Sequence, residues 1–386
     1  MHKKLLILLA ALLVALAVPA LAEEAPDITK ECTIKMNGKN FINKPMTDRY
    51  YDTHYQLRKG VVLEVESKDE TISGVFIQHH DRPAGLEIQI EQDGQWQVVG
   101  EGGCKYLTEW FPVPEGVKKL RIVSVGETRL FINELYIYGE GERPARVHVW
   151  EDLEKADLML LVAHPDDDLL WFCGLLPTYA GERDLEVQVA YLVPSTPRRR
   201  LELLDGLWTC GVEDYPLFAN MRDNRADTLS GQYKLWNKKT VLERVVGLVR
   251  QTKPDVIVTQ DVNGEYGHGA HRVVADVTML AVEQAADATC FPDSALRHGT
   301  WQIKKCYLHL YPENQITMDW QQPLAAFGGE TSYEVACRAL ECHKSQTLRG
   351  WEMADGDRMH NNLFGLYYTA VGPDVAGNDF MENIVR

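Results

Sequence analysis

The chain has 386 residues, with 40 Lys and Arg against 56 Asp and Glu, and its formal net charge is -16 at pH 7. A surface this acidic disfavours nucleic acid and anionic membranes as partners, because both are negatively charged. The length predicts two domains, or one large domain with insertions.

The N-terminus has the pattern of a secretory signal peptide. Lys3 and Lys4 precede an apolar run at 5–16, and the small-residue site Ala20-Leu21-Ala22 stands directly before two acidic residues. We expect residues 1–22 to be removed by cleavage after Ala22, which makes the protein secreted or extracytoplasmic. No later stretch reaches the length of a membrane span. The eight cysteines permit disulfides in that compartment without requiring them, so their pairing stays open.

Residues 30–141 predict an all-β sandwich. Apolar and polar residues alternate in short runs separated by turn signals such as Asp93-Gly94, without a convincing helical period. Two packed sheets are the natural way to bury one face of so many short strands. The predicted strands include 61–65, 72–77, 86–90, 120–125 and 130–138.

The order of these strands, and the final run 131–139 (FINELYIYG), resemble the discoidin-like, galactose-binding-like jelly rolls. Members of that group bind glycans through loop aromatics. The resemblance therefore implies a glycan-binding face at Trp110 and Phe111, or at Tyr50 and Tyr51. Core or edge packing explains the same aromatics equally simply, so carbohydrate binding by this domain stays open.

A linker is predicted at 142–155, since Gly, Pro and charges without an apolar period begin at 139–146. From 156 to 386 strands and helices alternate. Short apolar runs predict parallel strands buried on both faces at 158–163, 187–193, 255–259 and 305–310. Helical patterns are found at 169–178, 199–209, 239–251, 272–285 and 333–343. The expected fold class is α/β, a Rossmann-like and mostly parallel sheet with helices on both faces, preceded by the smaller sandwich.

Polar residues follow two of these parallel strands, at the sheet edge where such folds bind ligands. His164-Pro165-Asp166-Asp167-Asp168 follows the first strand, and Tyr266-Gly267-His268-Gly269-Ala270-His271 follows the third. Helix capping explains one or two of the Asp residues, but it does not explain a His at the end of a buried strand.

The spacing of these residues predicts a metal site. We expect His164 and Asp167 to converge on one metal ion, while His268 and His271 face the same pocket and supply a third ligand. Two His and one carboxylate suit zinc and leave a position open for water. Non-haem iron uses the same ligand types, but His-x-x-Asp at a strand-to-helix turn favours a hydrolytic metal.

The segments at 163–168 (AHPDDD) and 267–272 (GHGAHR) resemble the signature segments AHPDDE and GHPDH of the PIG-L/LmbE-like superfamily. Members of this superfamily are zinc de-N-acetylases that act on N-acetylglucosamine units. The resemblance covers roughly 158–346. It implies that Zn²⁺ is held by His164, Asp167 and His271.

The resemblance also implies the roles of other residues. Asp166 matches the general base, His268 the residue that steadies the oxyanion or donates a proton, and Tyr266 a tyrosine that helps to polarise the amide. Arg199 lies in an R-x-x-E segment whose Arg reaches the substrate. The segment His343-Lys344-Ser345-Gln346 is similar to a C-terminal family segment of less defined role.

This chain departs from the family pattern at two places. Asp168 replaces the usual Glu at a supporting position. Gly269-Ala270 replaces Pro-Asp between the two His, which removes a carboxylate that could orient a ligand His. Glu265 is the candidate to replace that carboxylate. His298, His309 and His360 stand alone in the sequence and are interpreted as ordinary surface or core histidines.

The function expected from the sequence is a secreted, zinc-dependent hydrolase that removes N-acetyl groups from N-acetylglucosamine-type sugars in glycans or glycoconjugates. One alternative is a secreted glycan-binding protein whose deacetylase-like domain is inactive. Another is a metal hydrolase of a different N-acyl or ester bond. The sugar, its linkage and the acyl group depend on loops such as 218–233, whose shape the sequence does not reveal.

Overall fold

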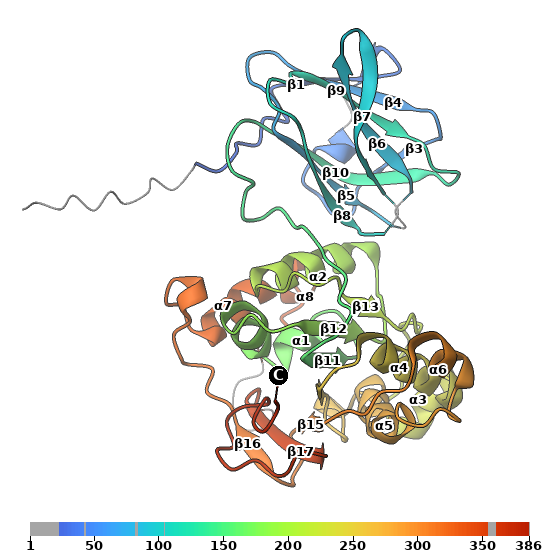
Figure 1. The fold of residues 1–386 in the computed structure, drawn as a ribbon, viewed down its shortest axis with the longest axis vertical. Helices are drawn as coiled ribbons and strands as arrows, with labels where there is room; N and C mark the ends of the chain where they lie inside the picture. Colours follow the sequence, from blue (N-terminus) through green and yellow to red (C-terminus); the bar gives the residue numbers. More distant parts are fainter. Residues whose placement is uncertain (1–22, 42–43, 82–83, 104, 354–359, 386) are drawn as a thin grey trace, which may run out of the picture.

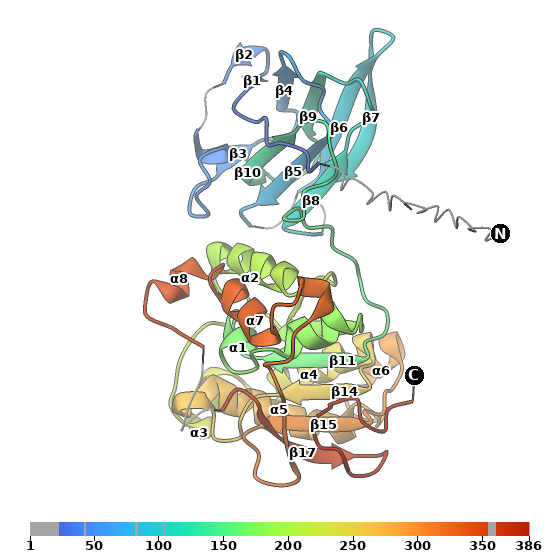
Figure 2. The same ribbon diagram turned by 90° about the vertical axis from the view of Figure 1, so that its left-hand side faces the viewer.

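The computed structural model describes residues 23–41, 44–81, 84–103, 105–353 and 360–385. They form two lobes stacked along the long axis of the molecule, with the all-β lobe above the α/β lobe in Figure 1. An extended segment runs from one lobe to the other, and the C-terminus lies on the α/β lobe (Figure 2). The predicted signal peptide, 1–22, lies outside the described residues.

The N-terminal lobe is built from two antiparallel sheets, with strand orders β2-β1-β4-β9-β6-β7 and β3-β10-β5-β8. Alternate residues of each strand point between the sheets, where Leu63, Ile122 and Leu135 are fully buried. The predicted β-sandwich is therefore confirmed. Its strands are β1 (Cys32–Met36), β2 (Lys39–Asn40), β3 (Tyr55–Leu57), β4 (Val62–Ser67), β5 (Gly74–His79), β6 (Leu86–Gln92), β7 (Gln95–Gly102), β8 (Thr108–Pro112), β9 (Lys119–Ser124) and β10 (Leu130–Tyr138).

The C-terminal lobe has one seven-stranded sheet, in the order β13-β12-β11-β14-β15-β17-β16. The first five strands in this order are parallel, and β17 and β16 complete one edge in antiparallel orientation. The α/β class and its mostly parallel sheet are thus as predicted. The strands are β11 (Leu158–Val162), β12 (Val187–Tyr191), β13 (Leu217–Phe218), β14 (Val256–Thr259), β15 (Lys305–His309), β16 (Gln315–Thr317) and β17 (Leu363–Thr369).

Helices cover both faces of this sheet (Figures 1 and 2). Leu158, Leu160 and Val162 of β11 share one buried core with α1, α2 and α7, whereas Met159 and Leu161 share the other core with α4 and α5. Burial on both faces explains why these strands are continuous apolar runs. The helices are α1 (Asp167–Leu170), α2 (Pro197–Thr209), α3 (Leu229–Leu235), α4 (Lys238–Thr252), α5 (Gly269–Gln284), α6 (Pro292–His298), α7 (Ser332–Leu340) and α8 (Lys344–Thr347).

The helix predicted at 169–178 is wrong in its extent. The first helix begins at Asp167 and ends at Leu170, and a short π-helical segment follows at Pro177–Glu182. Cys173 has φ of +43°, which interrupts the helix. A Cβ on Gly174 would lie 2.5 Å from Ser332 Oγ, so α7 packs directly against the break. The residues before and after the break are both buried, so the apolar period continues through it. The sequence pattern therefore does not show where the helix is interrupted.

Helix α2 joins the two lobes. Arg198 Nη1 donates to Asp52 at 2.6 Å, and Arg200 Nη2 donates to Asp81 at 3.0 Å. The Tyr51 hydroxyl donates to Asp205. These contacts connect α2 to loops at the lower edge of the sandwich (Figure 1).

The aromatics that the discoidin-like resemblance singled out are mostly packed. Phe111 is 5% exposed in the sandwich core, and Trp110 lies against Gly74 and Tyr138. Tyr51 is held in the contact between the lobes. Only Tyr50, of these four, presents its side chain to solvent, at 67% exposure.

Two further observations concern the cysteines and the apolar character of the helices. Cys32, Cys210, Cys290, Cys306 and Cys342 carry free thiols. Within the described ranges, no helix combines the length and apolar character that a bilayer crossing requires.

Candidate metal centre and active site

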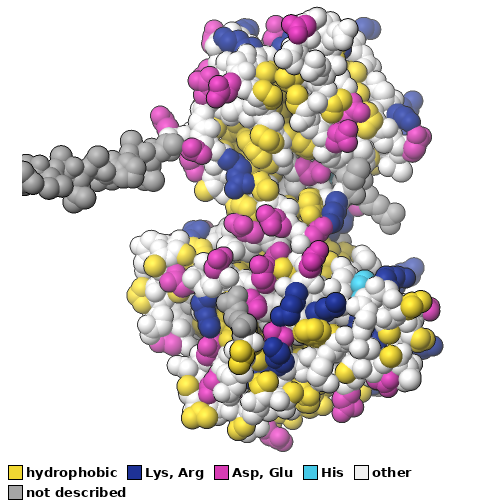
Figure 3. All heavy atoms as spheres, in the orientation of Figure 1, with side chains coloured by type: hydrophobic (Ala, Val, Ile, Leu, Met, Phe, Trp, Pro, Cys, Tyr) yellow, Lys and Arg dark blue, Asp and Glu magenta, His cyan; other side chains and the backbone are white. Residues whose placement is uncertain are grey.

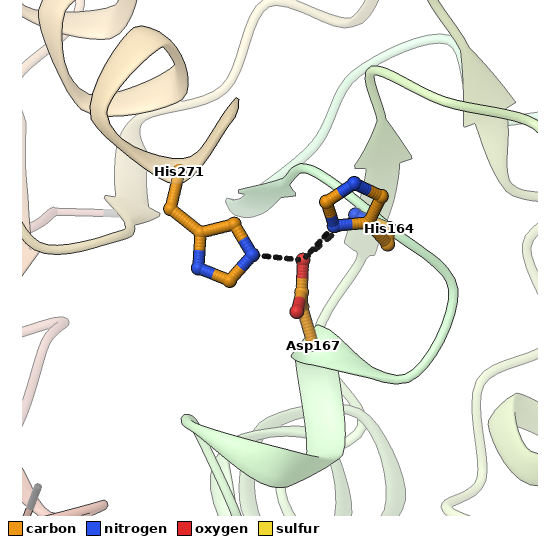
Figure 4. Close-up of side chains that lie close together, drawn as sticks. All are labelled: His164, Asp167 and His271. Atoms are coloured by element: carbon orange, nitrogen blue, oxygen red, sulfur yellow. Dashed lines mark hydrogen bonds and ion pairs between the residues drawn. The ribbon is translucent and has the colours of Figure 1, made fainter. Parts of the chain in front are cut away.

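Three side chains meet at the carboxyl edge of the parallel sheet. His164 follows β11, Asp167 begins α1, and His271 lies in the first turn of α5. Asp167 Oδ2 lies 3.2 Å from His164 Nδ1 and 3.4 Å from His271 Nε2 (Figure 4). One ligand atom from each residue lies within 4.8 Å of the other two. The structure therefore brings together the three residues that the sequence predicts as metal ligands.

The chemistry of this cluster fits a divalent metal. His271 Nε2 is buried and makes no hydrogen bond to any residue that the structure describes. A buried polar atom left in this way costs about 1–3 kcal/mol unless a ligand engages it. Although burial raises the pKa of Asp167, His271 and His164 lower it below its ordinary value, so the carboxylate is ionised. Two imidazoles and one carboxylate also leave a coordination position for water or substrate.

A buried carboxylate behind the cluster orients His271. Glu265 Oε2 lies 2.8 Å from His271 Nδ1, and Glu265 Oε1 lies 2.8 Å from His309 Nδ1. With Nδ1–H of His271 donated to Glu265, Nε2 is the ring nitrogen that faces Asp167 and that can bind a metal once it is deprotonated. His309 is a core histidine, as predicted, but it is not an isolated one. His309 ends β15, a parallel strand of the same sheet, and this position could have indicated that it lies near the site.

The Gly269-Ala270 departure from the family pattern has a structural reason. Gly269 N donates to the Ala226 carbonyl at 2.9 Å, and a Cβ on Gly269 would lie 2.3 Å from that oxygen. Proline therefore does not fit here, because it has a Cβ and no N–H. Ala270 is fully buried in the apolar core, where a carboxylate would be costly. Glu265 occupies the orienting position instead.

Asp166 stands at the N-cap position of α1 but does not cap the helix. Its backbone has φ of 115°, and its side chain makes no capping hydrogen bond. Oδ1 instead pairs with Arg199 Nη2 at 2.8 Å. Burial raises the pKa of Asp166, helped by Asp167 and Asp168, and Arg199 opposes the shift. A non-glycine residue at positive φ is strained, and such strain is typical of functional turns.

Arg199 also donates to the Pro165 carbonyl, so its guanidinium fixes the turn that carries Asp166. The Glu of the R-x-x-E segment, Glu202, contacts a different Arg, since Arg198 Nε donates to it at 2.8 Å. Glu202 also accepts hydrogen bonds from the backbone and the hydroxyl of Ser345. The two family-like segments on α2 and α8 are thereby tied together.

His268 and Tyr266 lie at the opening of the same site. His268 Nδ1 accepts a hydrogen bond from Ala270 N at 3.1 Å, which places the ring proton on Nε2. Burial lowers the pKa of His268 to about 3, so the ring is neutral. Tyr266 is 38% exposed, and its ring centroid lies 5.6 Å from that of His268. Burial raises the pKa of Tyr266, so its hydroxyl remains a donor.

A pocket of about 220 Å³ joins these groups. Asp166, Arg199, Tyr266 and His268 line it together with His164 and Asp167 of the metal cluster. Three further lining residues, Gln346, Arg349 and Trp351, come from α8 and the chain after it. Gln346 belongs to a segment singled out from the sequence, whereas the other two were not predicted. Both residues closely follow the 343–346 segment in the sequence, and this proximity is the feature that could have indicated them.

Comparison with known proteins concerns chiefly the α/β lobe. Residues 159–282 match the family model PIG-L, described as GlcNAc-PI de-N-acetylase. A 1D-myo-inositol 2-acetamido-2-deoxy-alpha-D-glucopyranoside deacetylase from Frankia casuarinae is 29% identical over 220 residues, which cover 48% of this chain and 67% of that protein. The match thus spans about two thirds of the length of this relative.

Two solved structures are similar to separate parts of the chain. N,N'-diacetylchitobiose deacetylase from Pyrococcus horikoshii has a TM-score of 0.38 and 18% identity, covering 50% of this chain and 71% of that one. A family 32 CBM from Clostridium perfringens NanJ, in complex with galactose, has a TM-score of 0.25 and 17% identity, covering 31% of this chain and 99% of that one. The discoidin-like character of the sandwich stays a prediction.

Proposed function

We propose, from the match of residues 159–282 to the PIG-L family model, that the protein is a zinc-dependent de-N-acetylase of N-acetylglucosamine-type amino sugars. The observation that carries the proposal is the buried cluster of His164, Asp167 and His271, with Asp166 and His268 facing the same pocket. The names of the relatives, which are deacetylases of N-acetylated amino sugars, support the substrate class.

The three-residue cluster would hold the metal through His164 Nδ1, an Asp167 oxygen and His271 Nε2. Zinc bound there supplies Lewis acidity, which lowers the pKa of water and polarises a carbonyl. Glu265 keeps His271 in the tautomer that binds a metal. The Trp171 indole N–H donates to the other oxygen of Asp167 at 3.0 Å and fixes the orientation of that carboxylate.

Asp166 acts as the general base. It takes a proton from the attacking water as the water oxygen forms a bond to the acetyl carbon. Arg199 holds the carboxylate by its 2.8 Å ion pair, and the carboxylate is free of a capping hydrogen bond to α1. The amide C–N bond then breaks, which yields acetate and the free amine of the sugar.

His268 and Tyr266 stabilise the transition state. The developing oxyanion needs donors that are already oriented, and His268 Nε2–H and the Tyr266 hydroxyl are two protonated groups that line the pocket. The proton for the leaving amine is available on Asp166, which has taken it from water, whereas the neutral His268 ring would have to give up its only N–H to supply it. Arg199 also reaches the substrate in this proposal, through the part of its guanidinium that faces the pocket.

The site of action is proposed to be outside the cytoplasm, on a glycan or glycoconjugate. The signal-peptide pattern of residues 1–22 supports this location. An inactive deacetylase-like domain in a glycan-binding protein, and hydrolysis of another N-acyl or ester bond, are the alternatives.

Acetate release tests the proposal directly. Purified protein is incubated with N-acetylglucosamine and with its oligomers, before and after chelation and after zinc is restored. We expect release that chelator abolishes and zinc recovers. Bound zinc without release from any N-acetylated sugar would favour the glycan-binding alternative. Release from other acyl amides or esters alone would favour the other hydrolase.

A further inference from the structure

A second cavity lies between the two lobes, outside the metal site. Its volume is about 1070 Å³, and its wall comes from both lobes. The sandwich contributes the loop at 48–52 and Tyr136, and the α/β lobe contributes α2, α7 and α8. Figure 3 shows acidic and basic side chains side by side along the groove between the lobes.

The cavity and the active-site pocket are lined by neighbouring residues of the same two stretches of chain, and no residue lines both. In the first turn of α2, Arg198 lines the cavity and Arg199 lines the pocket. Along α8, Lys344 lines the cavity and Gln346 lines the pocket. Directly after α8, Leu348 lines the cavity and Arg349 lines the pocket. A chain-like ligand that leaves the pocket across these two elements therefore enters the cavity.

The two spaces differ in size in a way that suggests different roles. Sites for drug-sized ligands measure about 300–1,000 Å³. The active-site pocket, at about 220 Å³, falls below this range, and the cavity, at about 1070 Å³, lies just above it. The pocket has room for little more than the sugar unit that carries the acetyl group. The rest of a longer glycan needs a second place on the protein.

The lining of the cavity suits a neutral, hydroxyl-rich ligand. Five basic and five acidic side chains line it, so neither charge dominates. Sugar hydroxyls both donate and accept hydrogen bonds, and a mixed lining offers both kinds of partner. The ring of Tyr136 is covered by Arg49, whose Cζ lies 3.7 Å from the ring centroid. Tyr50 therefore offers the accessible aromatic surface, at 67% exposure.

The hydrogen bonds of Tyr50 to its neighbours are made by its backbone. Its N–H donates to Glu134 Oε1 at 3.1 Å and to Asp48 Oδ1 at 3.0 Å. These bonds set the backbone that carries the ring before any ligand arrives, so binding has only the side chain left to order. The contacts of α2 with Asp52 and Tyr51 hold the two walls of the cavity together.

We propose that this cavity is a distal subsite, which binds sugar units of a neutral glycan whose N-acetylated unit occupies the active-site pocket. The inference rests on the proposed deacetylase function and specifies its substrate as an oligosaccharide. Binding remote units supplies energy that positions the reacting amide, so a longer substrate reacts with a higher kcat/KM. Through Tyr50 and its loop, the sandwich takes part in substrate selection.

The test compares kcat/KM for N-acetylglucosamine with that for its β-1,4-linked hexamer. In the unmodified protein we expect the hexamer to be favoured at least about tenfold, and Tyr50→Ala to remove most of that preference. Leu348→Ala, in the lining of the cavity, is the second variant. Its matched control is Leu296→Ala in α6, because the two leucines are 84% and 89% exposed. The control should keep the full preference for the hexamer.

The outcomes separate the two proposals. Acetate release without a preference for the hexamer overturns the distal subsite and leaves the deacetylase intact. The subsite is likewise overturned if Tyr50→Ala and Leu348→Ala behave like the control. A preference for an anionic hexamer over the neutral one contradicts the neutral class of ligand. No release from any N-acetylated sugar overturns the proposed function, and the subsite with it.

Discussion

Glu265 Oε2 lies 2.8 Å from Nδ1 of His271, and both side chains are fully buried. Glu265 therefore lies where a carboxylate can orient His271, in a chain that has none between His268 and His271. Because burial excludes water, the carboxylate has few alternatives to His271 and His309 as partners. Although burial alone raises the pKa of Glu265, its hydrogen bonds to these two histidines lower it, so it remains an ionised acceptor.

Glu265→Gln should weaken zinc binding roughly 10- to 100-fold, the usual effect of removing a carboxylate behind a ligand histidine. Competition with a chromophoric chelator measures the affinity. Glu134→Gln is a matched control, because Glu134 is a fully buried carboxylate in the sandwich. Equal zinc affinity in the two variants would contradict the orienting role of Glu265.

Asp166→Asn should retain zinc and lose turnover by about 100-fold or more, because the variant has no base to accept the proton of water. His164→Ala should lose both zinc and turnover. Zinc content and the rate of acetate release are measured on the same preparation. If Asp166→Asn keeps its activity, Asp166 is not the base.

Tyr266→Phe should lower kcat by about 100-fold with little change in zinc content, since it removes one hydroxyl donor near the developing oxyanion. Steady-state kinetics at saturating zinc separate kcat from KM. A change in KM alone would place Tyr266 in ground-state substrate binding instead.

Asp205→Asn tests how the contact between the lobes depends on pH. Burial raises the pKa of Asp205 to about 7, against an ordinary value of about 4 in the unfolded chain. Between about pH 4 and pH 7, Asp205 is protonated in the folded protein and ionised in the unfolded chain. The contribution of Asp205 to the free energy of unfolding is therefore fully present below about pH 4 and is lost as the pH rises through about 7.

The free energy of unfolding should accordingly fall less steeply from pH 4 to pH 8 in Asp205→Asn than in the unmodified protein. Urea denaturation at several pH values measures both curves. Parallel curves would show that Asp205 has an ordinary pKa in the folded state, despite its contacts with Tyr51 and His148.

Local patterns were sufficient for the four central strands of the α/β sheet, β12, β11, β14 and β15, and for the metal cluster, but not for β13, β16 and β17. Leu158 to Val162 is apolar at every position because both faces of the strand are buried, and this pattern is visible in one sequence. The carboxyl ends of parallel strands share one edge of the sheet, so His164, Asp167 and His271 could be predicted to meet. Helix ends were less predictable. Shortly after the break that follows Leu170, Ser332 of α7 packs against Gly174, and the local hydrophobic period gives no sign of this contact.

Tertiary packing alone decided the rest of the site. Glu265 contacts His309, Asp166 pairs with Arg199, and the loop of Tyr50 reaches the cavity opposite Lys344. The partners in these pairs are far apart along the chain, and each is unremarkable in its own segment. A buried carboxylate or an exposed aromatic acquires its role from the neighbours that folding places beside it. Hydrophobic periodicity reports which face of an element is buried, but not which polar groups meet across the fold.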